Sequence, residues 1–311
     1  MNNANFLSCN GGGARGRLEL DMLQYLYEKM GGAFFRHFDI IGGTSTGSLI
    51  TALLATGKTP KEISTIYDTE LGNIFSGGFC REIIGKSKHS NEYIKELATS
   101  LIGDIELGEL RQKILIPTVN SSKQETKIFK SYDERDKNYK LVDVIIASSS
   151  APRYFPSHEM SILEKEGYVK QWFKDGGLSS NNPSDILALE GLDPEKRFGK
   201  INILSITSGE NKDAVTKAEK KGNLLSIPEM IDEILNLQDK KSHGTVETYK
   251  KYGLLRGGVY IRCEAEIEES SGGIDDASPK NIKAMKKDAA FSLLQNKSKL
   301  DLYHLKTLKN D

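Results

Sequence analysis

The chain has 311 residues, of which 38% are hydrophobic and 28% charged, enough for one large α/β domain or two small ones. Lys and Arg together number 43, as do Asp and Glu, so the formal net charge is +0. This balance argues against a nucleic-acid-binding protein, which normally carries a basic excess. The cysteines, Cys9, Cys80 and Cys263, lack a metal-binding spacing, and their odd number fits a reducing compartment.

The sequence gives no sign of a targeting or membrane segment. Residues 1–5 contain neither a basic region nor an apolar one, so we expect no signal peptide. No apolar run approaches the roughly 18 residues of a spanning helix. We therefore expect a soluble cytoplasmic protein.

Strand patterns and helix patterns alternate along the chain. The expected strands lie at 5–9, 38–41, 113–119, 127–130, 168–173, 201–206 and 259–262. Expected helices follow near residues 18, 49, 60, 91, 141, 183, 226 and 279. Residues 72–90 are expected to be irregular, as a plain loop or a lid, and 211–222 to be a solvated connection. The alternation predicts an α/β fold: a mostly parallel central sheet flanked by helices on both faces, in a single domain over 1–311.

A strand, a Gly-x-Ser-x-Gly turn and a helix follow one another around Ser45. The apolar strand 38–41 leads into Gly43-Thr44-Ser45-Thr46-Gly47, and a buried helix follows. This order is the context that a nucleophile elbow requires, because the sharp turn projects the serine hydroxyl away from the sheet. The glycines leave room for strand and helix to converge. As a bare string the motif is also compatible with an ordinary strand-to-helix turn.

A second glycine-rich turn, Gly11-Gly12-Gly13-Ala14-Arg15-Gly16, follows the first strand. It matches a dinucleotide-binding fingerprint, but that fold needs an acidic residue at the end of the second strand, and Asp39 stands at its start. The alternative is an anion-binding nest of backbone N–H groups that holds an oxyanion beside a serine nucleophile. Arg15 then adds positive charge or fixes the loop; it could also be a surface arginine.

A serine nucleophile needs a base, and none of the five histidines has a convincing setting. His158 is the best placed, but no acid partner for it is evident. Asp175 ends an apolar strand, and Gly176 and Gly177 clear space beside it. Partial burial would raise its pKa toward that of a useful base. An Asp-Gly-Gly turn is common by itself, and the small-residue segment 147–156 indicates only a tight turn that lines something.

These motifs together resemble the patatin-like phospholipases. The chain has the family's Gly-Gly-Gly-Ala-Arg-Gly (11–16), Gly-Thr-Ser-Thr-Gly (43–47), Ala-Ser-Ser-Ser-Ala-Pro-Arg-Tyr-Phe-Pro (147–156) and Asp-Gly-Gly (175–177) in the family's order. The segments 181–183, 260–262 and 274–278 also resemble the family, so the likeness covers nearly the whole chain. Some relatives have glycine or proline in place of Ala14 or Ala151.

The resemblance implies a lipid acyl hydrolase with a Ser–Asp dyad. Ser45 would be the nucleophile and Asp175 the base, and the N–H groups of Gly11, Gly12 and Gly13 would form the oxyanion hole with Arg15 nearby. The reaction would pass through an acyl-serine intermediate without a metal or organic cofactor. The implied partner is a membrane lipid reached by peripheral contact, and an activator, small molecule or protein, is left open.

Two other functions stay open at this point. The first is a nucleotide-binding oxidoreductase that uses the 11–16 loop. The second is a catalytically silent binding or storage protein on the same fold.

Overall fold

The computed structural model describes residues 2–75, 87, 89–210 and 227–308. Its strands are β1 (Ala4–Cys9), β2 (Ile40–Gly43), β3 (Ile114–Asn120), β4 (Glu125–Lys130), β5 (His158–Glu164), β6 (Gly167–Asp175), β7 (Ile201–Ile206) and β8 (Tyr260–Cys263). Its α-helices are α1 (Leu20–Met30), α2 (Phe34–His37), α3 (Thr46–Ala55), α4 (Pro60–Ile74), α6 (Asn91–Ile102), α7 (Leu141–Ser149), α8 (Gly177–Ser180), α9 (Ser184–Leu192), α11 (Ile227–Lys251) and α12 (Pro279–Thr307). Short 3₁₀ helices are η1 (Gly13–Glu19), η2 (Gly31–Ala33) and η3 (Leu107–Glu109).

The strands of the described residues form one sheet in the order β5-β6-β3-β2-β1-β7-β8, with β4 paired to β3. The middle strands β3, β2, β1, β7 and β8 run parallel, whereas β4 and β6 run antiparallel to β3, and β5 antiparallel to β6. Cys9 lies opposite Gly43 on β2 and opposite Ile206 on β7. The carboxyl ends of these three strands therefore lie at one edge of the sheet, where open α/β folds bind ligands.

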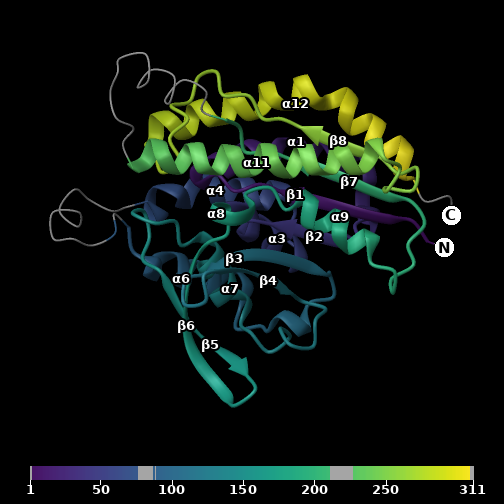
Figure 1. Cartoon of the computed structure of the whole chain (residues 1–311). Coiled ribbons are helices and arrows are strands. Elements are labelled where there is room, and N and C mark those ends of the chain that lie inside the picture. Colours follow the sequence, from purple (N-terminus) through teal and green to yellow (C-terminus); the bar gives the residue numbers. More distant parts are fainter. Residues whose placement is uncertain (1, 76–86, 88, 211–226, 309–311) are drawn as a thin grey trace.

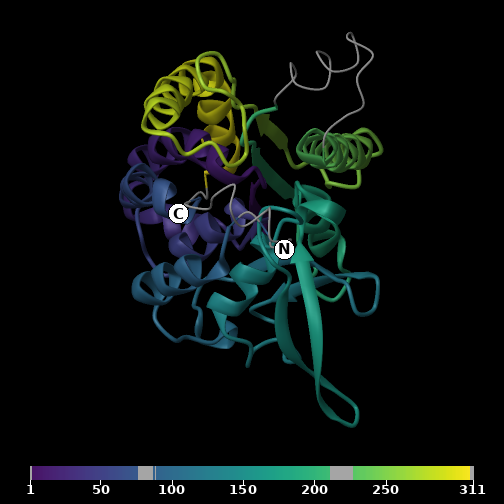
Figure 2. The ribbon, with the colours of Figure 1, turned by 90° about the vertical axis from the view of Figure 1, so that its left-hand side faces the viewer.

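Helices cover both faces of the sheet. On one face the core contains side chains from α1, α3, α4, α7 and α12; on the other, α9 and α11 pack against β1, β2 and β7. Figure 1 shows α11 and α9 in front of the sheet, and Figure 2, turned by 90°, shows α11 and α12 on opposite sides of its β8 end. The hairpin of β5 and β6 extends away from these layers in both views (Figures 1 and 2).

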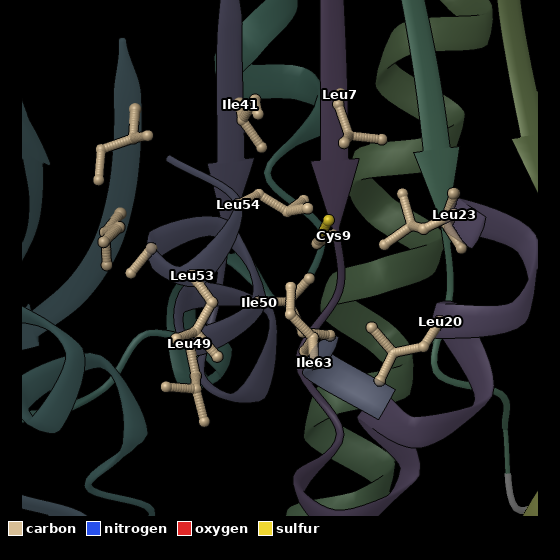
Figure 3. Close-up of a cluster of buried hydrophobic side chains, with 14 of the residues drawn as sticks. Leu7, Cys9, Leu20, Leu23, Ile41, Leu49, Ile50, Leu53, Leu54 and Ile63 are labelled. Atoms are coloured by element: carbon tan, nitrogen blue, oxygen red, sulfur yellow. The ribbon is translucent and has the colours of Figure 1, made fainter. Parts of the chain in front are cut away.

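The central core is built where α3 crosses β1 and β2 (Figure 3). Leu7 and Ile41 project from the two strands toward Ile50 and Leu54 of α3, and all four are buried. Removing such a side chain from water contributes about 1.5–3 kcal/mol. This packing fixes the start of α3 relative to the end of β2, and so fixes the turn between them.

The structure confirms the expected α/β class and most of the expected elements, with three differences. A further strand, β5, occupies 158–164, and residues 227–251 form one long helix. Strand β2 lies two residues further along the chain than expected and includes Gly42 and Gly43. Of the segments expected to be irregular, 72–74 end α4, whereas 76–86, 88 and 211–222 lie outside the described residues.

Candidate active site

Ser45 lies in a sharp turn between the end of β2 at Gly43 and the start of α3 at Thr46. Its backbone has φ 53° and ψ −121°, and a positive φ is rare for a residue with a side chain. The Ser45 N–H donates to Oγ of Ser148 at 3.0 Å, and that hydroxyl donates to the Pro117 carbonyl at 2.7 Å. The strained turn is thus held by α7 and β3. This is the geometry of a nucleophile elbow.

The two glycines around Ser45 are required by space. A Cβ atom on Gly43 would lie 2.1 Å from the Gly47 carbonyl oxygen, and one on Gly47 would lie 2.3 Å from the Cys9 carbonyl oxygen. Real Cβ atoms do not approach backbone oxygens so closely. Glycine at both positions therefore allows β1, β2 and α3 to converge beneath Ser45, as expected from the motif.

Asp175 ends β6 and lies beside Ser45. Asp175 is 3% exposed, its carboxylate accepts a hydrogen bond from the Gly177 N–H at 2.7 Å, and it lines the same cavity as Ser45. Burial raises the pKa of Asp175 to about 6, and the nearby Gly177 N–H and Ser45 side chain partly oppose the rise. The structure thus brings the two predicted side chains together and gives the carboxylate a pKa closer to neutral.

The glycine loop at 11–13 lies against the same site, but its three N–H groups are not equivalent. The Gly11 N–H already donates to the Asn181 carbonyl at 3.0 Å, so the expectation that it faces an oxyanion is wrong. The N–H groups of Gly12 and Gly13 have no acceptor among the described residues, and both glycines line the cavity that contains Ser45. Gly13 has φ +59°, and a Cβ there would lie 2.1 Å from the Ile274 carbonyl oxygen.

The buried side chain of Arg15 holds the 11–13 glycine loop in place. It is 2% exposed, and its Nη2 lies 3.1 Å from Oδ1 of Asp232 on α11. Its Nη1 donates to the Gly272 carbonyl at 3.1 Å. The arginine is therefore neither a surface residue nor part of the cavity wall. Its charge is bound to Asp232, and it joins the N-terminal loop to the C-terminal third of the chain.

A narrow apolar cavity opens beside Ser45 and Asp175. Its volume is about 70 Å³, enough for a few water molecules. Part of the 147–156 segment lines it, through Ser149, Ala151, Pro152, Tyr154 and Phe155, as the sequence indicated. The remaining apolar and aromatic wall comes from α3, α4, α6, α7, α8 and α11 and from short connections: Leu49, Tyr67, Leu71, Ile74, Phe75, Ile94, Ile145, Leu178, Ile231, Leu235 and Ile274. The sequence alone did not identify these residues as part of a site, because their helical spacing is the same as that of core residues.

The histidines lie apart from this cavity within the described chain. Nε2 of His158 is 3.1 Å from Oδ1 of Asp143, an acid partner that the sequence did not reveal. Nε2 of His89 is 3.2 Å from Oδ2 of Asp275, and its ring packs against those of Phe75 and Phe155. Neither ring lines the space around Ser45.

The described residues offer no cluster of three or more His, Cys, Asp or Glu side chains that could hold a metal. Among them there is also no helix with the length and apolar character needed to cross a bilayer. Dinucleotide binding by the 11–16 loop requires an acidic residue at the end of β2, and the structure has none there. Asp39 precedes β2 and accepts a hydrogen bond from the Asn5 N–H at 2.7 Å. It thus lies at the end of the sheet opposite to the glycine loop.

Comparison with known proteins identifies relatives of this chain. A family model described as "Patatin-like phospholipase" matches residues 7–188. Patatin-like protein 2 of Oryza sativa subsp. indica is 27% identical over 95% of this chain and 85% of its own length. A cGAMP-activated phospholipase of Vibrio cholerae serotype O1 is 32% identical over 67% of this chain and 65% of its own length.

A solved structure shows the same fold. VipD from Legionella pneumophila superposes with a TM-score of 0.50 at 15% identity, covering 97% of this chain and 67% of that one. The family match includes the glycine loop, the Ser45 turn and Asp175 and extends over more than half of the chain. The chain therefore belongs to the patatin-like phospholipase family.

Proposed function

We propose that this protein hydrolyses acyl ester bonds of phospholipids or related lipids, with Ser45 as nucleophile and Asp175 as base. The observation that carries the proposal is that a serine on a strained elbow and a buried carboxylate of raised pKa line the same cavity. Family membership supports lipid hydrolysis, and the open N–H groups of Gly12 and Gly13 supply the electrostatic part of the site.

In the first half of the reaction, Oγ of Ser45 attacks the ester carbonyl carbon while Asp175 takes the hydroxyl proton. The carbonyl oxygen becomes an oxyanion, and the N–H groups of Gly12 and Gly13 donate to it. The intermediate then collapses: the carbon–oxygen bond to the lipid alcohol breaks, and Asp175 returns the proton to that alcohol. The acyl group is left on Ser45.

In the second half, water attacks the acyl-serine and Asp175 takes a proton from it. The oxyanion forms at the same place, the bond to Oγ breaks, and the proton passes to Ser45 as the fatty acid leaves. Asp175 can act as the base without a histidine, because a pKa of about 6 lets its carboxyl group be ionised at neutral pH and still accept a proton in the transition state.

The apolar cavity supports an acyl-chain substrate, although its side chains must move to admit one. Its wall includes Ile231 and Leu235 of α11, and Met230 and Ile234 on the same helix are exposed. We propose that this exposed apolar surface contributes peripheral contact with the membrane from which the lipid is drawn. Such contact would let the substrate enter without crossing water.

The test compares acyl release from phospholipid vesicles by the native protein, Ser45→Ala and Asp175→Asn. Each substitution should lower turnover by at least about 1,000-fold. Ser161→Ala, which changes an exposed serine of β5, serves as the matched control and should keep native turnover. Retained turnover in Ser45→Ala or Asp175→Asn contradicts the proposed dyad.

A fluorophosphonate probe separates an active hydrolase from a silent binding protein on the same fold. It should label the native protein at Ser45 and leave Ser45→Ala unlabelled. An unlabelled native protein would favour the silent alternative.

A further inference from the structure

A second cavity, of about 770 Å³, lies at the other end of the sheet from Ser45. Strand β2 begins in its wall at Ile40 and ends beside the candidate active site, and α3 starts after Ser45 and ends in the wall at Ala55. The remaining wall is formed by segments that precede β2, β3 and β7 and by Tyr132 after β4. Its size falls within the range of about 300–1,000 Å³ that is typical of small-molecule sites. The reaction proposed above uses none of these residues.

The wall of this cavity is strongly basic, although the chain as a whole has no net charge. Arg36, Arg111 and Lys113 line it, and among the described residues none of the three has an ion-pair partner. Lys196 also lines it but is paired with Glu190. The only carboxylate among the described lining residues, Asp39, accepts a hydrogen bond from the Asn5 N–H. Three unpaired cations that share one cavity favour an anionic ligand.

Aromatic rings stand among these cations. Phe35, Tyr132 and Phe198, all partly exposed, line the cavity, together with a small exposed part of the core residue Phe38. Nζ of Lys113 lies 5.8 Å from the centroid of the Tyr132 ring, and Nζ of Lys196 lies 5.0 Å from it. Basic side chains alone are also explained by their favourable electrostatic interaction with the negative, carboxyl end of a helix such as α3. That role does not require an aromatic wall, whereas a ligand with both an anion and a planar ring uses both features.

We propose that this cavity binds a nucleotide, with its base against the aromatic side chains and its phosphates against Arg36, Arg111 and Lys113. The proposal concerns a site distinct from the candidate active site and does not depend on the chemistry of Ser45. Ser45→Ala protein is therefore expected to bind the nucleotide as the native protein does.

Isothermal titration calorimetry at 150 mM salt tests the proposal with three probes. Adenosine triphosphate carries both features, adenosine carries the ring alone, and inorganic tripolyphosphate carries the anion alone. We expect adenosine triphosphate to bind with a Kd below 1 mM and each half-probe to bind at least tenfold more weakly. Absence of adenosine triphosphate binding overturns the proposal. Tripolyphosphate binding of equal strength also overturns it, because the site would then be a general anion site.

Two charge-reversal pairs with the same change in net charge locate the binding. Arg111→Glu/Lys113→Glu changes the cavity, and Lys280→Glu/Lys283→Glu changes two exposed lysines of α12. The first pair should weaken adenosine triphosphate binding at least tenfold and the second less than twofold. Equal effects of the two pairs contradict the assignment. All four positions are exposed, so melting temperatures close to native are expected and show that the variants are folded.

Discussion

Replacing Asp175 by asparagine should abolish the proposed catalysis and at the same time stabilise the fold above neutral pH. The pKa of this carboxyl rises from its ordinary 3.8 to about 6 because burial penalises its charged form. A raised carboxyl pKa means that the folded chain holds this proton more tightly than the unfolded chain does. The contribution of this carboxyl group to the free energy of unfolding is therefore fully present below about pH 4 and is lost as the pH rises through about 6.

The size of the effect follows from the shift. A difference of about 2 pKa units corresponds to about 3 kcal/mol, at 1.36 kcal/mol per unit. Asparagine has almost the same shape, carries no charge, and can still accept from the Gly177 N–H. Asp175→Asn should thus exceed the native protein in unfolding free energy by about 3 kcal/mol at pH 8, and by much less near pH 4.5.

Urea denaturation between pH 4.5 and pH 8 measures this difference. Ser45→Ala is the control, because it removes the proposed nucleophile but keeps the buried carboxylate. Its stability should fall with rising pH as that of the native protein does, with the fall shifted slightly to higher pH because the Ser45 side chain lowers the Asp175 pKa. If Asp175→Asn differs from the native protein by the same amount at every pH, the buried charge is not what destabilises the site. A variant less stable than native at pH 8 would contradict the reasoning outright.

Three further predictions concern the site and its support. Acyl release should fall about tenfold for each pH unit below about pH 6, because Asp175 must be ionised to accept the Ser45 proton; a pH profile with no change through this range contradicts its role as base. Gly12→Ala should lower kcat about 100- to 1,000-fold, because the new Cβ would lie 2.1 Å from Oγ of Ser208 and displace the glycine loop. The control Gly32→Ala places its Cβ in open space and should match native turnover in the same vesicle assay. Arg262→Met should lower the free energy of unfolding by about 3–5 kcal/mol, because it leaves the largely buried Asp239 without its ion pair at 2.7 Å; urea denaturation measures the loss, and a change below 1 kcal/mol would show that the pair contributes little.

Local signals in the sequence were sufficient for the elements that carry their own start and stop residues. Helix α6 begins at residue 91, as expected, with Ser90 as its N-cap, and Gly103 with φ +83° follows its last residue. Helix α4 begins with the capping box formed by Thr59 and Glu62. These residues determine backbone geometry within a few positions along the chain, so their effect can be read without the tertiary structure.

Features that depend on distant contacts were harder to predict. The sequence does not predict strand β5, because three of its residues are charged or histidine and its pairing with β6 supplies the order that its own sequence lacks. The N–H of Gly11 was assigned to the oxyanion hole because no local signal reveals its bond to Asn181, 170 residues away. The partners of Arg15 and the cavity wall from α11 likewise became visible only in the folded chain.

The anchoring of Arg15 has a consequence for dividing this protein into parts. The family match ends at residue 188, yet the glycine loop is held by Asp232 and Gly272, and β1 takes one of its two neighbours from β7. A fragment cut at the boundary of the match would expose an open edge of β1 and leave the Arg15 guanidinium without its counter-ion. Any transplant of this candidate active site into another protein must therefore carry the chain past residue 274, where the Ile274 carbonyl accepts from the Ala14 N–H.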